Sequence, residues 1–211
     1  MRQEQRLSPE NGKKIEIAEY KRPLYNGPYC GDATAFHAEN GITNLLIVDG
    51  LGHGKQAEEA AVAAVNYVSN HWILDLPELF AECGNAIRDT RGVAMGIARI
   101  NEITGELSYA GIGNPRAIIA GENVIRLTST YGIVGSRYRK LNIEKAQLNQ
   151  GDLVLLFTDG LKERVDISAY KYLLNDNLDY LAMKILQDWS IERDDAAILI
   201  YRFSSLRGSA S

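Results

Sequence analysis

The chain has 211 residues, of which 45% are hydrophobic and 24% are charged. This length predicts one domain, and this apolar content excludes a largely disordered chain. The net charge of -4 argues against a nucleic-acid-binding protein, which needs an excess of basic residues. Two cysteines are too few for a disulfide scaffold. Because neither a secretory leader nor a run of about 18 apolar residues is visible, we expect a cytoplasmic protein without a membrane partner.

Both ends of the chain differ in composition from the rest. Residues 1–13 are polar, and residues 204–211 are rich in serine, glycine and alanine. We expect both segments to be loose. Residues 14–203 contain no linker, repeat or low-complexity stretch, and we therefore expect them to form one domain.

Strand patterns alternate with helical patterns along the chain. The first strand is expected at 15–20, a second begins after Asp32, and 45–48 is a continuous apolar run typical of a buried strand. Small residues at helical spacing predict a helix over 57–68. A second helix is expected after Asp75, which can cap it with Pro77 and Glu78 in the first turn.

The second half of the chain begins as a series of short strands. They are expected at 93–100, 106–110, 117–120, 124–127 and 153–157, followed by a helix over 178–186 and a last strand at 196–201. Segments 128–145 and 162–177 have no clear periodicity and are expected to be loops. Because most strands follow one another as hairpins, the pattern favours an α+β fold in which antiparallel sheets are covered by helices.

Four acidic positions stand at strand ends. Asp32 precedes a strand, Asp49 and Asp159 each follow an apolar run, and Asp194 with Asp195 precedes the last strand. A carboxylate against a buried strand is costly unless it is paired or bound to a cation, and oxygen ligands favour Mg²⁺ or Mn²⁺. Asp-Gly is also a common turn, so each pair alone fits an ordinary turn. Two such pairs after similar apolar runs favour one shared metal site.

Other catalytic motifs are missing from the sequence. The segment 50–55 (GLGHGK) is not a phosphate-binding loop, because its glycine spacing is short and Gln56 follows the lysine. No Gly-x-Ser-x-Gly segment and no zinc-like Cys/His cluster is present. Cys30 and Cys83 are expected to be small core residues.

The acidic motifs, in their order, resemble those of the metal-dependent (PPM, type 2C) serine/threonine phosphatases. The bacterial SpoIIE-type branch, and within it the small stand-alone phosphatases of stress signalling, is the most similar. The matching segments are Asp32, 48–54 (VDGLGHG), 157–160 (FTDG) and 193–197 (RDDAA), with further support from 30–32 (CGD), 91–92 (RG) and 113–116 (GNPR). The resemblance covers roughly residues 13–202.

This resemblance implies a four-layer αββα sandwich, in which two antiparallel β-sheets are flanked by helices. It also implies two Mn²⁺ or Mg²⁺ ions at one end of the sandwich. Asp49 would bridge both ions, the carbonyl of Gly50 would bind one, and Asp159 and Asp194 would bind the other. Asp32 would act nearby, directly or through water, so Asp49 and Asp32 are the expected catalytic residues. Asp194 matches the family's ligand better than its neighbour does, although an offset of one residue is open.

Some positions depart from the family's larger members. Leu51 stands where those enzymes have a histidine, and we expect His53, two residues on, to pack in the turn instead of acting as an acid. Their phosphate-binding arginine is not evident. Arg22, Arg137 and Arg139 are weak substitutes, which we expect to be solvated surface residues.

The resemblance implies a phosphatase that acts on phosphoserine or phosphothreonine of another protein. The implied substrate is a STAS-type protein of stress signalling (a stressosome-like partner), and we expect the phosphatase to be a monomer. Two other classes stay open: a catalytically weak pseudo-phosphatase that only binds a phosphoprotein, and a hydrolase of small phosphoesters.

Overall fold

The computed structural model describes residues 15–170 and 177–205. The loose segment expected at 1–13, residues 206–211 of the loose segment expected at 204–211, and part of the loop expected at 162–177 lie outside the described residues. None of the helices within the described part of the chain is long and apolar enough to cross a membrane.

Two five-stranded sheets form the centre of the molecule, and every strand pairing in them is antiparallel. The strand order is β1-β10-β9-β6-β7 in the first sheet and β2-β3-β4-β5-β8 in the second. In the first sheet the bounds are Glu16–Arg22 (β1), Arg116–Ala120 (β6), Val124–Leu127 (β7), Leu153–Phe157 (β9) and Ala196–Arg202 (β10). In the second they are Asp32–Glu39 (β2), Ile42–Gly50 (β3), Val93–Asn101 (β4), Glu106–Ile112 (β5) and Ile143–Gln147 (β8).

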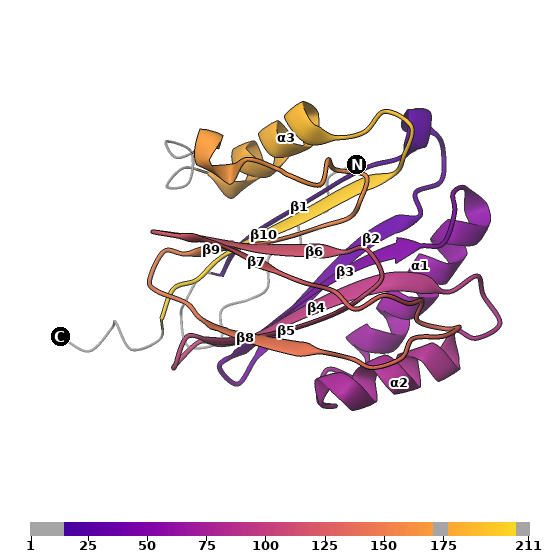
Figure 1. Cartoon of the computed structure of the whole chain (residues 1–211), viewed down its shortest axis with the longest axis horizontal. Helices are drawn as coiled ribbons and strands as arrows, with labels where there is room; N and C mark the ends of the chain where they lie inside the picture. The colour runs from indigo at the N-terminus through magenta and orange to yellow at the C-terminus, as the bar shows by residue number, and fades with distance from the viewer. Residues whose placement is uncertain (1–14, 171–176, 206–211) are drawn as a thin grey trace.

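Helices cover the outer faces of both sheets. In Figure 1, helix α3 (Leu178–Trp189) lies over the first sheet, and helices α1 (Lys55–Ser69) and α2 (Leu76–Ala86) lie on the opposite side, against the second. The expected αββα sandwich is therefore confirmed.

Residues 45–48 of β3 and all five residues of β9 are apolar because these segments are buried on both faces. In β9, Leu155 packs toward α3 while Val154 and Leu156 pack between the sheets. In β3, Leu46 packs toward α1 and α2 while Leu45 packs between the sheets. Alternation of side chains across a strand then requires an apolar residue at every position.

The helices begin and pack as their sequences dictate. In α1 the alanines at helical spacing are fully buried, so the helix lies close to β2 and β3. Helix α2 begins after Asp75, whose carboxylate accepts a hydrogen bond of 2.9 Å from the backbone N–H of Glu78. The expected cap of this helix is therefore present.

Strand β8 (Ile143–Gln147) was expected to be part of a loop, and that expectation is wrong. It pairs with β5 at the edge of the second sheet, and its side chains are exposed or only half-buried. A strand with so little burial has no apolar pattern to predict it. Short 3-10 turns at Leu24–Asn26 and Ile167–Tyr170 complete the described elements.

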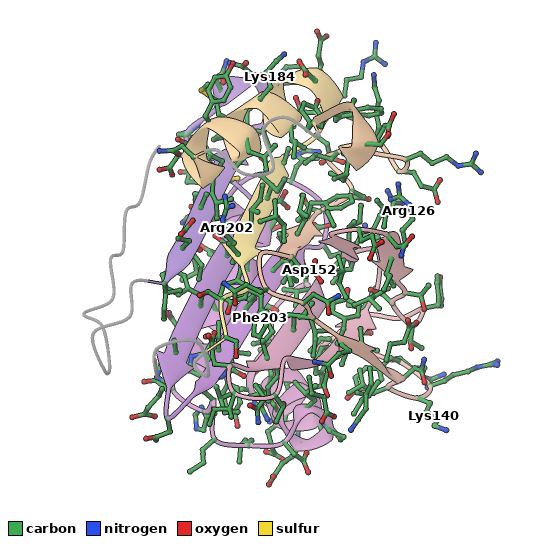
Figure 2. All side chains as sticks on the ribbon, turned by 90° about the vertical axis from the view of Figure 1, so that its left-hand side faces the viewer. Arg126, Lys140, Asp152, Lys184, Arg202 and Phe203 are labelled. Carbon is green, nitrogen blue, oxygen red and sulfur yellow. The ribbon has the colours of Figure 1, made fainter. Side chains whose placement is uncertain are left out.

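The start of β9 and the end of β10 meet at one end of the sandwich. The N–H of Phe203 donates a 2.9 Å hydrogen bond to the carbonyl of Asp152, and Figure 2, which views this end, labels both residues. The strands run from here to the opposite end, where Asp159 follows β9 and Asp194 precedes β10.

We expect Leu156→Ala to destabilise the protein, because Leu156 is fully buried between the sheets. The loss of packing should lower the free energy of unfolding by about 2–5 kcal/mol, measured by urea denaturation. Ile73→Ala is the control, since Ile73 is 95% exposed and its truncation should change stability by less than about 0.5 kcal/mol. Equal effects of the two substitutions would contradict this account of the core.

Candidate active site

Strand pairing gathers four aspartates at one end of the sandwich. Asp32 lies directly opposite Asp49 in the pairing of β2 with β3. Asp159 follows β9, and Asp194 precedes β10, which pairs with β9 antiparallel. The two sheets thus bring together residues that are far apart in the sequence.

Asp49 lies at the centre of this group. Its carboxyl forms a hydrogen bond with that of Asp159. Burial, together with the charges of Asp159 and Asp194, raises the pKa of Asp49 to about 8. Two carboxyl groups this close repel each other when both are ionised, so they share a proton unless a cation binds beside them.

The neighbouring carboxyl groups show the same excess of negative charge. Burial and the charge of Asp49 raise the pKa of Asp32 well above its usual range, although a hydrogen bond from Thr158 opposes the shift. Burial and the charge of Asp159 raise the pKa of Asp194, while nearby His53 lowers it. Within the described residues, no lysine or arginine forms an ion pair with these carboxyls, so their negative charge is not compensated by a direct partner.

The donor set fits a hard divalent cation. All four aspartates offer carboxylate oxygens, which Mg²⁺ and Mn²⁺ prefer, and a cation would offset their repulsion. In the described residues these side chains approach one another in pairs, and no group of three His, Cys, Asp or Glu side chains is close enough to hold an ion as it stands. Binding therefore requires rotation of carboxylates toward a common point.

Thr158 fixes the orientation of Asp32. Its hydroxyl donates a 2.6 Å hydrogen bond to Oδ2 of Asp32 and accepts one of 2.9 Å from the N–H of Ala197. Both side chains are buried. The threonine lies within the segment 157–160 that predicted the site, but its role depends on Asp32 and Ala197, which are distant in the sequence.

Asn114 fixes Asp159 in a similar way. Its Nδ2 donates a hydrogen bond of 2.5 Å to Oδ2 of Asp159, and its amide also interacts with Asp49. Its Oδ1 is buried and has no hydrogen-bond partner in the described structure. The preceding Gly113 has φ of 93°, and a Cβ there would lie 2.4 Å from that of Ala94. The Gly-Asn-Pro segment was the signal, since a polar amide at a tight turn between two strands has to satisfy its hydrogen bonds there.

Asp195 is occupied by backbone hydrogen bonds. Its carboxylate accepts from the N–H of Leu24 at 2.7 Å and from the N–H of Gly31 at 2.9 Å, and the residue is buried. Asp194 is half-buried and interacts with Asp159. The Asp194 carboxylate accepts one backbone hydrogen bond, of 2.9 Å, from the N–H of Asp195 to its Oδ1, so it is less occupied by backbone groups than that of Asp195.

Arg22 differs from the expectation of a solvated surface residue. It is half-buried at the end of β1, and its Nη2 donates to the carbonyls of Ile191 at 2.6 Å and Asp194 at 3.1 Å. It thus restrains the loop that carries Asp194. Arg137 and Arg139 are exposed, as expected.

Two glycines allow the backbone to pass close to this loop and to α1. A Cβ on Gly50 would lie 2.1 Å from the carbonyl oxygen of Ala57, and a Cβ on Gly160 would lie 1.7 Å from that of Asp195. Neither position has space for a larger residue. The Asp-Gly pairs are therefore required by the close packing of strand ends.

The remaining candidates have distinct surroundings. The expectation that His53 packs in the turn is wrong, because its side chain is exposed. The glycine-rich loop directs it to the surface beside Asp194. Leu51 is also exposed.

Cys30 and Cys83 are buried, and burial raises the pKa of each thiol to about 12. Such thiols are poor nucleophiles at neutral pH, so the core role expected for both cysteines fits their surroundings.

Comparison with known sequences identifies similar proteins. Residues 39–204 match the family described as Stage II sporulation protein E (SpoIIE). The phosphoserine phosphatase RsbX of Bacillus subtilis (strain 168) is 26% identical over 158 residues, which cover 74% of this chain and 79% of that protein.

Solved structures share the fold over most of the chain. A chain from work on the bacterial stressosome, described as a modular system adapted to control secondary messenger signalling, is 29% identical with a TM-score of 0.85. The similarity covers 90% of this chain and 100% of that one. RsbX in complex with magnesium is 23% identical with a TM-score of 0.79, over 90% and 96% of the two chains.

In the absence of divalent cations, Asp49→Asn should stabilise the protein at pH 8. The raised pKa means that the folded protein retains a proton that the unfolded chain loses near pH 4, so the stability of the wild type falls as the pH rises from about 4 to about 8. Asparagine has no such cost. In urea denaturation with EDTA, the gain should be roughly 1 kcal/mol or more at pH 8 and near zero at pH 4.

Asp89→Asn is the control for that measurement, since Asp89 is exposed and should show little dependence of stability on pH. A variant at Asp49 that loses stability at pH 8 would contradict the proposed excess of negative charge.

Substitutions should distinguish the roles of Asp194 and Asp195. Asp195→Asn should lower the free energy of unfolding by about 1–3 kcal/mol, because it weakens two buried hydrogen bonds to backbone N–H groups. Asp194→Asn should leave stability unchanged or higher while weakening Mn²⁺ binding. Urea denaturation and isothermal titration calorimetry would measure the two effects, and the reverse pattern would assign the ligand to Asp195.

Proposed function

The chain belongs to the SpoIIE family, and on this premise we propose that it is a metal-dependent phosphatase that hydrolyses phosphoserine or phosphothreonine on another protein. The observation that carries the proposal is the convergence of Asp49 with Asp159 and Asp194, without compensating charge, at one end of the sandwich. A module that only binds a phosphoprotein has no need of clustered carboxylates, which would repel a phosphate.

We infer that two cations, Mn²⁺ or Mg²⁺, bind at this end. Asp49 would help to hold both ions, the carbonyl of Gly50 would help to hold one, and Asp159 and Asp194 would help to hold the other, with Asp32 acting directly or through water. When bound, such ions lower the pKa of water and offset the negative charge of a phosphoryl group. No nucleophilic side chain is required, which fits the burial of both cysteines.

The residues around the aspartates orient them for this role. The Thr158 hydroxyl holds one oxygen of Asp32, and the Asn114 amide holds one oxygen of Asp159, so each leaves its other oxygen for a ligand. Arg22 restrains the Asp194 loop through backbone carbonyls and leaves the carboxylate itself uncompensated. Asp32 and Asp159 are thus restrained before an ion binds, which lowers the conformational freedom that these two side chains lose on binding.

The substrate that we propose is a phosphorylated STAS-type protein of stress signalling. Support comes from the 26% identity to the phosphoserine phosphatase RsbX and the 29% identity to a chain from work on the bacterial stressosome. We further propose that residues 14–203 act as one domain, and that the protein is a cytoplasmic monomer.

The purified protein should release phosphate from a phosphoprotein and from p-nitrophenyl phosphate when Mn²⁺ or Mg²⁺ is present, and EDTA should abolish the release. Asp49→Asn should lower the rate by about two orders of magnitude or more, because it removes a charge that binds the ions. Asp89→Asn should keep the wild-type rate. A fully active Asp49→Asn variant would overturn the assignment.

Two other outcomes would redirect the proposal. Metal binding seen by calorimetry without any phosphate release would support a pseudo-phosphatase. Faster turnover of small phosphometabolites than of phosphoproteins would support a hydrolase of small phosphoesters.

A further inference from the structure

A groove of about 470 Å³ opens beside the acidic site. Asn114 lines it and also donates the hydrogen bond to Asp159, so the groove lies next to the site and shares this residue with it. Strands β6 and β7 and the segment after Asp159 form its walls. A substrate whose phosphate reaches the aspartates would extend along these walls.

The charge of the groove is opposite to that of the site. Three arginines line it, Arg116 from β6, Arg126 from β7 and Arg164 from the segment after Asp159, against the single carboxylate of Glu163. The whole chain has a net charge of -4, so a basic groove is not a consequence of overall composition. Arginine presents a planar fork that matches carboxylate and phosphate groups.

The three arginines differ in the hydrogen bonds and ion pairs that their side chains already form. Arg126, labelled toward the right-hand margin of Figure 2, donates a 2.8 Å hydrogen bond to the carbonyl of Val165. Arg116 contacts Glu163 at 3.8 Å, and the Glu163 side chain is 77% exposed. Arg164 is exposed and has no hydrogen bond or ion pair to the described residues.

The contact between Arg116 and Glu163 indicates what the groove can accept. Arg116 is half-buried, but the ion pair is long, at 3.8 Å, and Glu163 is mostly exposed, so the pair contributes little to stability and another carboxylate can replace Glu163 at little cost. Glu163 thus occupies the position that an acidic side chain of a ligand would take.

We propose that this groove, through Arg116 and Arg164, binds acidic side chains that flank the phosphorylated residue of the substrate. The inference rests on the proposed function, since it names the kind of phosphoprotein that the site accepts. The acidic site repels anions, so arginines beside it would attract an acidic segment and direct its phosphate toward the ion-binding end.

The test uses two fluorescein-labelled phosphoserine peptides that differ only in flanking residues, glutamate in one and glutamine in the other. Fluorescence anisotropy in EDTA measures binding without turnover. The wild type should bind the acidic peptide about three- to tenfold more tightly, as expected for one or two exposed ion pairs. In Arg116→Gln/Arg164→Gln the difference should fall below about twofold, whereas the control Arg88→Gln should retain it.

A second variant should change the affinity for the acidic peptide in the opposite direction. Glu163→Gln removes the carboxylate that competes for Arg116, so the acidic peptide should bind roughly twofold more tightly than it does to the wild type. A general loss of folding cannot produce a gain in affinity. Equal binding of the two peptides by the wild type, or a preference that survives in the double arginine variant, would overturn the proposal.

Turnover tests the proposed function separately. With Mn²⁺, Arg116→Gln/Arg164→Gln should hydrolyse p-nitrophenyl phosphate within about twofold of the wild-type rate, because this small substrate does not reach the groove. The same variant should lower kcat/KM for the acidic phosphopeptide by about three- to tenfold through a higher KM. A wild type that hydrolyses neither substrate would overturn the phosphatase assignment, while the peptide preference in EDTA would still decide the groove.

Discussion

Repulsion among carboxylates at one end of the sandwich is the constraint on which the rest of the structure depends. The pairing of β2 with β3 sets Asp32 opposite Asp49, and the end of β9 brings Asp159 within hydrogen-bonding distance of Asp49. A protein selected for stability alone would place apolar or oppositely charged residues there, because buried like charges are costly. The large apolar core between the sheets and beneath the helices tolerates this cost, and the site gains carboxylates at one end of the sandwich that a rotation of side chains can turn toward an ion.

The parts around the aspartates restrain them without neutralising them. Thr158 and Asn114 donate neutral hydrogen bonds, and the positive charge of Arg22 is directed to backbone carbonyls. Glycines at 50 and 160 allow strand ends to approach the backbone of Ala57 and Asp195. Each contact fixes geometry while it preserves the negative charge that attracts cations. The arginines that line the neighbouring groove form no ion pair with the aspartates in the described part of the chain. Their positive charge can therefore attract an anionic substrate without weakening the binding of ions.

The sequence predicted the features that depend on local pattern. The apolar runs of β3 and β9 and the Asp75 cap of α2 were visible because burial on two faces and helix capping leave marks within a few residues. Arg22 and Asn114 were missed as parts of the site, because their partners lie more than 40 positions away. The distinction between Asp194 and Asp195 likewise depends on which carboxylate faces the N–H of Gly31, and no local pattern contains that information.

The hydrogen bond from Gly31 to Asp195 joins residues separated by 164 positions in the sequence. It connects the segment between β1 and β2 to the start of β10, the last strand in the described part of the chain. Strand β10 also lies between β1 and β9, so β1 has no partner in its sheet until the chain has been made as far as β10. The acidic end therefore forms only when β10 and the residues before it are present, because a chain that terminates before them lacks both Asp194 and the hydrogen bond from Gly31 to Asp195.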